Sequence, residues 1–289
     1  MVKAKIARRS NLSRVWKVLR GNPTTLVGVV IVSVFIILIA FGPLIALHSP
    51  TEQDMSIRLK PPSSEHPLGT DQFGRDILSR IIIGSRNVGA VASLGTAIAV
   101  LAGLALGMIS GYVGGIVDDV IMRLLEVMMA IPGILLAMLI LFSLGSSMLN
   151  VILVVGFVYT PVVSRVVRSV VLDYKTRQFV EAAKLRGESV FYILAKEILP
   201  NVLPHLAVEA SMRFVYSIFL VASLGFLGLG VQPPHPDWGL MLNEARYHYY
   251  LAPWALLFPA GAIAILTVGV GFVSDGLRKM LLPGGVSNE

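Results

Sequence analysis

The chain has 289 residues, no cysteine and a formal net charge of +7, and 55% of its residues are hydrophobic while 14% are charged. A soluble domain is closer to a quarter charged, so this composition argues against a soluble globule. The absence of cysteine excludes a disulfide framework and thiolate metal sites. Five long runs carry no charge, namely 21–51, 87–117, 127–164, 214–236 and 247–274.

Each uncharged run is long enough to cross a bilayer, because a membrane-spanning helix needs about 20 apolar residues. The run 127–164 exceeds one span and is interrupted at 145–147 by Gly-Ser-Ser, so it counts as two. The sequence therefore predicts an all-α polytopic membrane protein with about six transmembrane helices.

Basic residues flank these runs rather than forming one patch. Seven precede the first run, seven surround the segment between the fourth and fifth predicted spans, and Arg278 and Lys279 follow the last span. Positive charge marks the cytoplasmic side of membrane proteins. We therefore expect both termini and that central segment in the cytoplasm, and no nucleic-acid partner.

The N-terminal part of the chain divides into three expected segments. Residues 1–23 form a basic cytoplasmic tail, and residues 24–47 form a first transmembrane helix. This run is too long for a signal peptide and lacks a clear cleavage site, so it is expected to remain as an anchor. Residues 48–86 form an extracytoplasmic segment that ends in an interfacial helix.

The interfacial helix is expected to begin at a capping Thr70 or Asp71. Asp71 and Arg75 are four residues apart and can pair on a helix. The same spacing relates Asp76 to Arg80.

Residues 87–277 are expected to hold the remaining five spans. The second span carries Gly95, Gly103 and Gly107, and small residues allow close helix packing in lipid. Pro132 is expected to bend the third span, because proline removes a helical hydrogen bond. Pro161 in the fourth span frees a carbonyl that needs a partner inside the protein.

A polar segment, residues 172–202, separates the fourth and fifth spans. Gly187 can end one short helix in the left-handed conformation, and Ser189 can cap a second one that runs to about Leu199. Pro200 is expected at the end of that helix. From composition alone the segment is either an ordinary connection or a knob that inserts into a groove of a partner.

The fifth span is expected to begin near Leu203, with Glu209 and Arg213 in its first turns. These two residues are four apart and are expected to pair, either as a cytoplasmic gate or as an anchor. Trp238, in the proline-rich loop that follows, is expected at the membrane interface. Residues 278–289 form a cytoplasmic tail.

No catalytic, cofactor or metal site is predicted. The chain has no G-x-x-x-x-G-K-[ST] loop for ATP and no HExxH spacing. Four histidines fall on the expected outer side, where they are either plain surface residues or help to pass a metal ion. They are His48, His66, His235 and His248.

Three motifs resemble the permeases of ABC importers, and those of the dipeptide, oligopeptide and nickel type in particular. The polar segment carries the residues of the EAA signature. Residues 69–80 match GTD-x-x-GRD-x-x-SR, and 224–239 match LGFLGLG-x-Q-P-P-x-P-x-WG. Glu197 and Glu126 depart from the more usual isoleucine and aspartate. The signature residues are Glu181, Ala182, Ala183, Gly187, Leu199 and Pro200.

This resemblance implies a type I importer core of five helices with one extra N-terminal helix. It also implies a homologous permease as partner, two ATPase subunits that bind ATP and Mg²⁺, and an extracytoplasmic solute-binding protein. The EAA segment would couple to the ATPases in a bacterial or archaeal cytoplasmic membrane. Peptides are the expected solute, with nickel, glutathione or another small solute as alternatives.

Two rival functions are an ion-driven secondary transporter and a membrane scaffold without transport activity. An ion-driven transporter needs intramembrane carboxylates, and none is expected in the middle of a span. Co-purification with an ATPase would separate both rivals from the importer.

Overall fold

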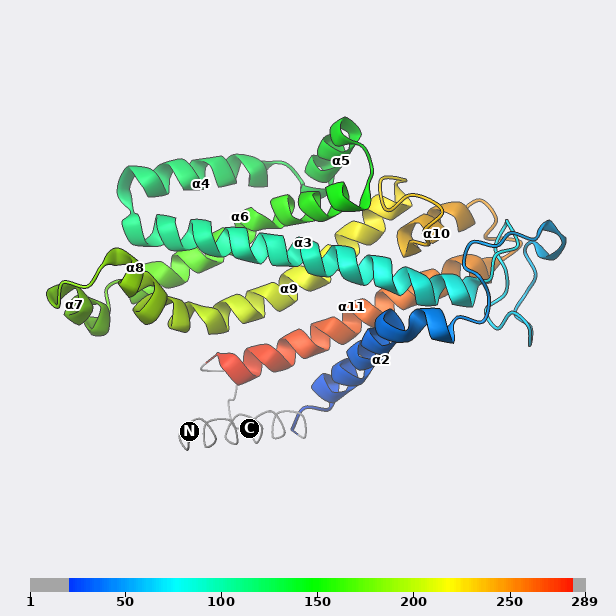
Figure 1. The fold of residues 1–289 in the computed structure, drawn as a ribbon, viewed down its shortest axis with the longest axis horizontal. Coiled ribbons are helices and arrows are strands. Elements are labelled where there is room, and N and C mark those ends of the chain that lie inside the picture. Colours follow the sequence, from blue (N-terminus) through cyan, green and yellow to red (C-terminus); the bar gives the residue numbers. More distant parts are fainter. Residues whose placement is uncertain (1–20, 283–289) are drawn as a thin grey trace.

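The computed structural model describes residues 21–282, and Figure 1 shows them as an elongated bundle of helices. The one β-type pairing among these residues is an isolated bridge between Thr70 and Asp76. The helices are α2 (Pro23–Ile45), α3 (Ile77–Val113), α4 (Gly115–Ala130), α5 (Gly133–Leu144), α6 (Met148–Tyr174), α7 (Gln178–Leu185), α8 (Val190–Tyr192), α9 (Leu199–Phe226), α10 (Trp238–Ala245) and α11 (Pro253–Leu281).

The expected all-α fold with about six spans is confirmed. Within the described residues, 5 helices are long and apolar enough to cross a membrane, and α4 with α5 makes up to 6 if that pair counts as one span. The two helices of the pair meet at 90°. Pro132 lies between them as the residue preceding α5. The bend expected at Pro132 is therefore present, and it is sharp enough to divide the span into two helices.

Helix α3 is the centre of the bundle. Its residues belong to all three hydrophobic clusters of the core, which also draw on α2, α6, α9 and α11. Along α6, a Cβ added at Gly95 or Gly103 would lie 2.6 Å from a valine side chain. At Gly107 it would lie 2.5 Å from the Ser164 carbonyl oxygen. The expected role of these glycines in close packing is confirmed, since any larger residue would push the two helices apart.

The bundle has two ends, which we name by their short helices. The α7 end comprises residues 175–198, and the α10 end comprises residues 46–76 and 227–252 (Figure 1). Helix α2 lies in the half of the bundle next to the α10 end (Figure 1) and packs on α11, where a Cβ at Gly28 would lie 2.6 Å from the Gly269 carbonyl oxygen. The other side of α2 exposes large apolar residues such as Leu44, as expected for a lipid-facing surface.

The expected helix cap at Thr70 or Asp71 is wrong. Helix α3 begins at Ile77, and Asp76 is the residue whose carboxylate accepts the first free backbone N–H, that of Ser79. Asp71 instead accepts the N–H groups of Phe73 and Arg75 in a turn. Gly74 follows with φ 73, a conformation that no right-handed helix contains. The helix therefore cannot start before this turn, and the residues expected to form an interfacial helix up to 86 are the first turns of α3.

The ion pairs of this turn were predicted only in part. Asp71 and Arg75 pair at 2.6 Å, as expected. Arg80 does not pair with Asp76, because it turns to Asp71 at 3.6 Å and to Glu244 of α10 at 3.4 Å. These buried charges tie the start of α3 to α10.

The expectation for Trp238 is also wrong. Its side chain is fully buried instead of lying at the membrane interface. The indole Nε1 donates to the Ile81 carbonyl oxygen at 3.0 Å, and the ring packs edge-on against Phe35. Gly84 provides the space, since a Cβ there would lie 2.9 Å from the indole. Trp238 therefore joins α2, α3 and α10.

Candidate functional site

The segment at the α7 end folds into two helices with a defined break between them. Helix α7 ends in a Schellman motif, in which the Glu188 N–H donates to the Ala183 carbonyl and the Gly187 N–H to that of Lys184. Gly187 has φ 77, the left-handed value this motif needs. Ser189 then accepts the Tyr192 N–H and caps α8. Both the break at Gly187 and the cap at Ser189 are confirmed.

The second helix does not end at Leu199 as expected. It runs from Val190 to Phe226 without interruption. The turns before Pro200 are π-helical over Ile193–Ile198. A π turn widens the helix at the point where the proline ring would crowd the preceding turn. The helix can therefore pass through Pro200, and α8 and α9 form one continuous rod.

One face of this segment is fixed to the bundle. Val180 and Ala183 of α7, with Ile193 and Ile198 of the π-helical turns, are buried in the same cluster as residues of α3 and α6. Arg186 adds polar contacts, at 3.5 Å to both Glu188 and Glu197. Glu197, which departs from the more usual isoleucine, therefore has a partner.

The opposite face of the segment is apolar and uncovered. Leu185 is 90% exposed and Phe191 80% exposed, and Val190 also lies at the surface. Lipid explains such exposure at Leu44 of α2, whereas exposed apolar side chains on a segment rich in charged residues mark a surface for a partner. We call Leu185, Val190 and Phe191 the apolar tip. No motif in the sequence singled out these residues.

The signature residues divide between the two faces. Ala183 is buried and Leu199 half-buried, so both contribute to the attachment. Glu181, Ala182, Gly187 and Pro200 are exposed. A Cβ at Gly187 would meet nothing within 4 Å, so the backbone conformation alone requires glycine there.

The second predicted site, Glu209 with Arg213, is an ion pair of 2.8 Å, as expected. Both side chains are mostly buried. The pair lies in the middle of α9 and not in its first turns. The reason is that the continuous helix containing α9 begins at Val190, well before Leu203. The Arg213 guanidinium also lies 4.7 Å from the ring centre of Tyr216 and 5.7 Å from that of Tyr159 on α6. The pair therefore links α9 to α6 deep in the bundle.

A further ion pair was not foreseen. Arg168 of α6 donates through two nitrogens to both carboxylate oxygens of Asp118 on α4. The Lys175 Nζ donates to the Gly111 carbonyl oxygen at 2.9 Å. These contacts hold the end of α6 against α3 and α4 beside the segment at the α7 end. The residues are far apart in sequence, and no spacing signal could have paired them.

These observations define the class of the protein. Membrane-length helices packed around α3, with a firmly attached segment that exposes an apolar tip at one end, describe a multi-pass membrane protein. Residues 103–284 match the family described as the inner membrane component of binding-protein-dependent transport systems. Residues 10–62 match the N-terminal transmembrane domain of oligopeptide transport permease C. The chain belongs to this family of ABC transporter permeases.

Three relatives illustrate the similarity. A dipeptide transport system permease protein of Alkalihalophilus pseudofirmus is 41% identical over 271 residues, 93% of this chain and 88% of the relative. A probable D,D-dipeptide transport system permease protein of Escherichia coli is 37% identical over 279 residues, 96% of this chain and 93% of the relative. A glutathione transport system permease protein of Pectobacterium atrosepticum is 42% identical over 222 residues, 77% of this chain and 74% of the relative.

A solved structure supports the fold. A chain of the MetNI methionine ABC transporter in an inward facing conformation superposes with a TM-score of 0.60 and 19% identity. The match covers 71% of this chain and 98% of that chain. The fold is thus that of a type I importer permease core, and the expected family and fold are confirmed.

Proposed function

We propose that this chain is a permease subunit of an ATP-driven, binding-protein-dependent importer of dipeptides or oligopeptides. It would form the pore with a homologous permease in the cytoplasmic membrane of a bacterium or archaeon. Two ATPase subunits that bind ATP and Mg²⁺ would dock at the α7 end, and an extracytoplasmic binding protein would deliver the solute at the α10 end. Peptides are favoured because several relatives carry names of peptide permeases.

The apolar tip is the observation that carries this proposal. Leu185 and Phe191 are exposed on a segment whose other face is packed into the bundle. A flexible loop would deform when a neighbouring subunit moves, whereas this attached segment would transmit the movement to the helices it packs against. The tip therefore suits a groove in an ATPase subunit, with its aromatic side chain as the anchor.

Force would travel from the segment along α9. The rod from Val190 to Phe226 joins the apolar tip to the α10 end, and the Glu209–Arg213 pair ties its middle to α6. When ATP closes the two ATPases, the segment would move with them and tilt this rod. The spans would then switch from inward-facing to outward-facing, and the solute would enter from the binding protein.

Charge supports this orientation. The α7 end and the end of α6 beside it carry many basic residues, and Arg278 and Lys279 lie at the end of α11. The positive-inside tendency places such residues in the cytoplasm. The beginning of α2 and the end of α11 would then lie on the same side.

The proposal predicts that Phe191→Asp weakens binding of the ATPase subunits and abolishes uptake. A hot-spot aromatic residue contributes roughly 2 kcal/mol or more to an interface, so the affinity for the ATPases should fall at least about 30-fold. The measurement is co-purification with the ATPases, followed by ATP-dependent uptake of a labelled dipeptide into proteoliposomes.

Tyr250→Asp is the matched control. Tyr250 is 85% exposed and lies at the α10 end, away from the proposed ATPase site. This variant should keep its ATPase subunits. Normal co-purification and uptake by the Phe191 variant would contradict the proposal, as would uptake driven by an ion gradient without ATP.

A further inference from the structure

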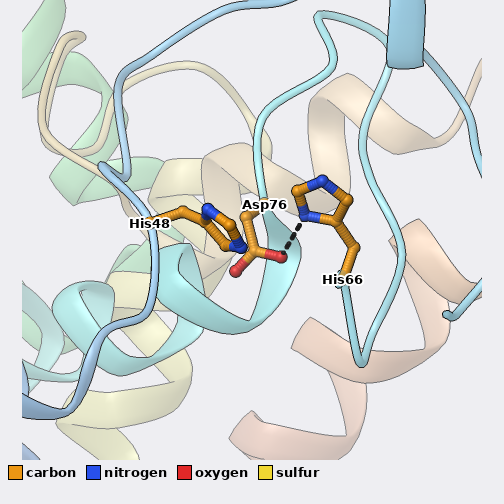
Figure 2. Close-up of side chains that lie close together, drawn as sticks. All are labelled: His48, His66 and Asp76. Atoms are coloured by element: carbon orange, nitrogen blue, oxygen red, sulfur yellow. Dashed lines mark hydrogen bonds and ion pairs between the residues drawn. The ribbon is translucent and has the colours of Figure 1, made fainter. Parts of the chain in front are cut away.

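Three residues from separate parts of the chain meet at the α10 end. His48 follows α2, His66 lies in the loop after it, and Asp76 caps α3 (Figure 2). One possible ligand atom from each lies within 4.8 Å of the other two. In the described part of the chain, this is the one group of three or more such side chains close enough to hold a metal ion.

Each of the three residues makes hydrogen bonds in this arrangement. The Asp76 Oδ2 accepts the Ser79 N–H at 2.8 Å, while Oδ1 lies 3.0 Å from Nδ1 of His66. The His48 ring has its Nε2 3.0 Å from the Glu65 carbonyl oxygen, and the His48 backbone N–H donates to the Ser79 Oγ at 3.1 Å. His66 and Asp76 are buried, and His48 is half-buried with its ring centre 4.7 Å from that of His66.

We propose that His48, His66 and Asp76 bind one Zn²⁺ ion. Two imidazoles and one carboxylate are ligands that zinc takes at about 2.0–2.2 Å, with a fourth position for water. Ligand atoms around such an ion lie about 3.3–3.5 Å apart, given this bond length and a tetrahedral arrangement. The His66 Nδ1 and the Asp76 Oδ1 are 3.0 Å apart and must separate slightly, while His48, the most exposed member, must bring its ring closer to them.

Zinc binding requires one particular tautomer of His66. Zinc needs the lone pair of the His66 Nδ1, so the ring proton must reside on Nε2. The hydrogen bond between His66 and Asp76 is then replaced by two coordinate bonds to the ion. Asp76 keeps its Oδ2 contact with the Ser79 N–H, which holds the carboxylate in position as outer contacts do in metal sites.

Neighbouring positive charge does not oppose the ion. The guanidinium groups of Arg75 and Arg80 are close in sequence to Asp76, and both contact the carboxylates of Asp71 and Glu244. The ion would fasten the segment that follows α2 to the first turn of α3. The site is therefore structural, and it stabilises the face at which the solute would be delivered.

The test uses the full-length chain in its complex, without an affinity tag and treated with EDTA. Calorimetric titration with ZnCl₂ should show one site per chain, and His48→Gln should weaken it about tenfold or more. Zinc should also raise the unfolding temperature of the wild type and not that of the variant, because a ligand of the folded state stabilises it. Unfolding without metal shows whether the variant folds.

His235→Gln is the matched control, since His235 is exposed and outside the group. It should bind zinc like the wild type. Mg²⁺ should not compete, because it prefers six oxygen ligands. The proposal is overturned if the wild type binds no stoichiometric zinc, or if His48→Gln binds it as tightly as His235→Gln. Neither result depends on the transported solute or on ATP.

Discussion

Asp237, in the proline-rich loop before α10, lies in surroundings that disfavour its negative charge. Its carboxylate is fully buried, with Oδ1 accepting the Leu240 N–H at 2.9 Å and Oδ2 without a hydrogen-bond partner. Burial raises the pKa of Asp237 from 3.8 to about 6, against the opposing effect of backbone hydrogen bonds. Gly225 makes the space, since a Cβ there would lie against the Asp237 Oδ1.

This pKa shift predicts a pH-dependent stability. The folded chain holds the Asp237 proton more tightly than the unfolded chain, so stability falls as pH rises from about 4 to 6 and is then constant. A shift of about two units corresponds to roughly 3 kcal/mol. Asp237→Asn should remove this dependence, as measured by unfolding in detergent between pH 4 and 7.

Asp54→Asn provides the comparison, because Asp54 is exposed and its pKa is lowered by hydrogen bonds to Ser56. This variant should keep the loss of stability between pH 4 and 6. An unchanged pH profile for Asp237→Asn would show that the carboxylate is ionised in the fold.

At the scale of elements, the contact between α3 and α6 determines how closely the central helices of the bundle pack. Successive glycines of α3 face valines and backbone of α6, so the two helices approach more closely than larger side chains allow. This contact lies between the segment at the α7 end and the α10 end. Any widening of it would also disturb the attachment of the segment.

Gly103→Ala should therefore destabilise the protein by about 1–3 kcal/mol, the usual cost of overpacking. The new Cβ would lie 2.6 Å from that of Val163 and 3.0 Å from the Ser164 nitrogen. Gly261→Ala on α11 is the control, because a Cβ there meets nothing within 4 Å. Equal unfolding temperatures for the two variants would refute the packing argument.

At the scale of the molecule, α9 is the route from one end to the other. Its middle carries Glu209 and Arg213, whose charges are mostly buried beside Tyr159 of α6. A single charge in a membrane span costs about 2.5–3.5 kcal/mol. The pair should therefore matter as a unit, whether it gates the pore or anchors the two helices.

Charge reversal tests this unit. Glu209→Arg and Arg213→Glu should each reduce assembly and uptake, and the double reversal should restore part of both, with a coupling energy of about 0.5–3 kcal/mol. Asp173 and Arg177, paired at 2.8 Å but exposed, give the control. Their reversal should change little, since exposed pairs contribute about 0–1 kcal/mol. Strictly additive losses at Glu209 and Arg213 would mean that the two residues act separately.

The sequence alone determined the features that depend on local chemistry. Long uncharged runs require membrane helices, glycine at position 187 permits a left-handed turn, and residues four apart such as Glu209 and Arg213 pair on any helix. These properties arise from the residue and its near neighbours, and they persist wherever the helix lies. Three motifs in separate regions of the chain also indicated the family, because each matches a specific pattern of residues.

Only the tertiary structure decided which surfaces are covered. Tryptophan is a residue type common at membrane interfaces, yet Trp238 is buried. Leucine and phenylalanine are common core residue types, yet Leu185 and Phe191 are exposed. His48, His66 and Asp76 lie in different segments and meet through the path of the loop. Burial and long-range contact depend on how distant helices pack, and residue type or spacing does not encode that arrangement locally.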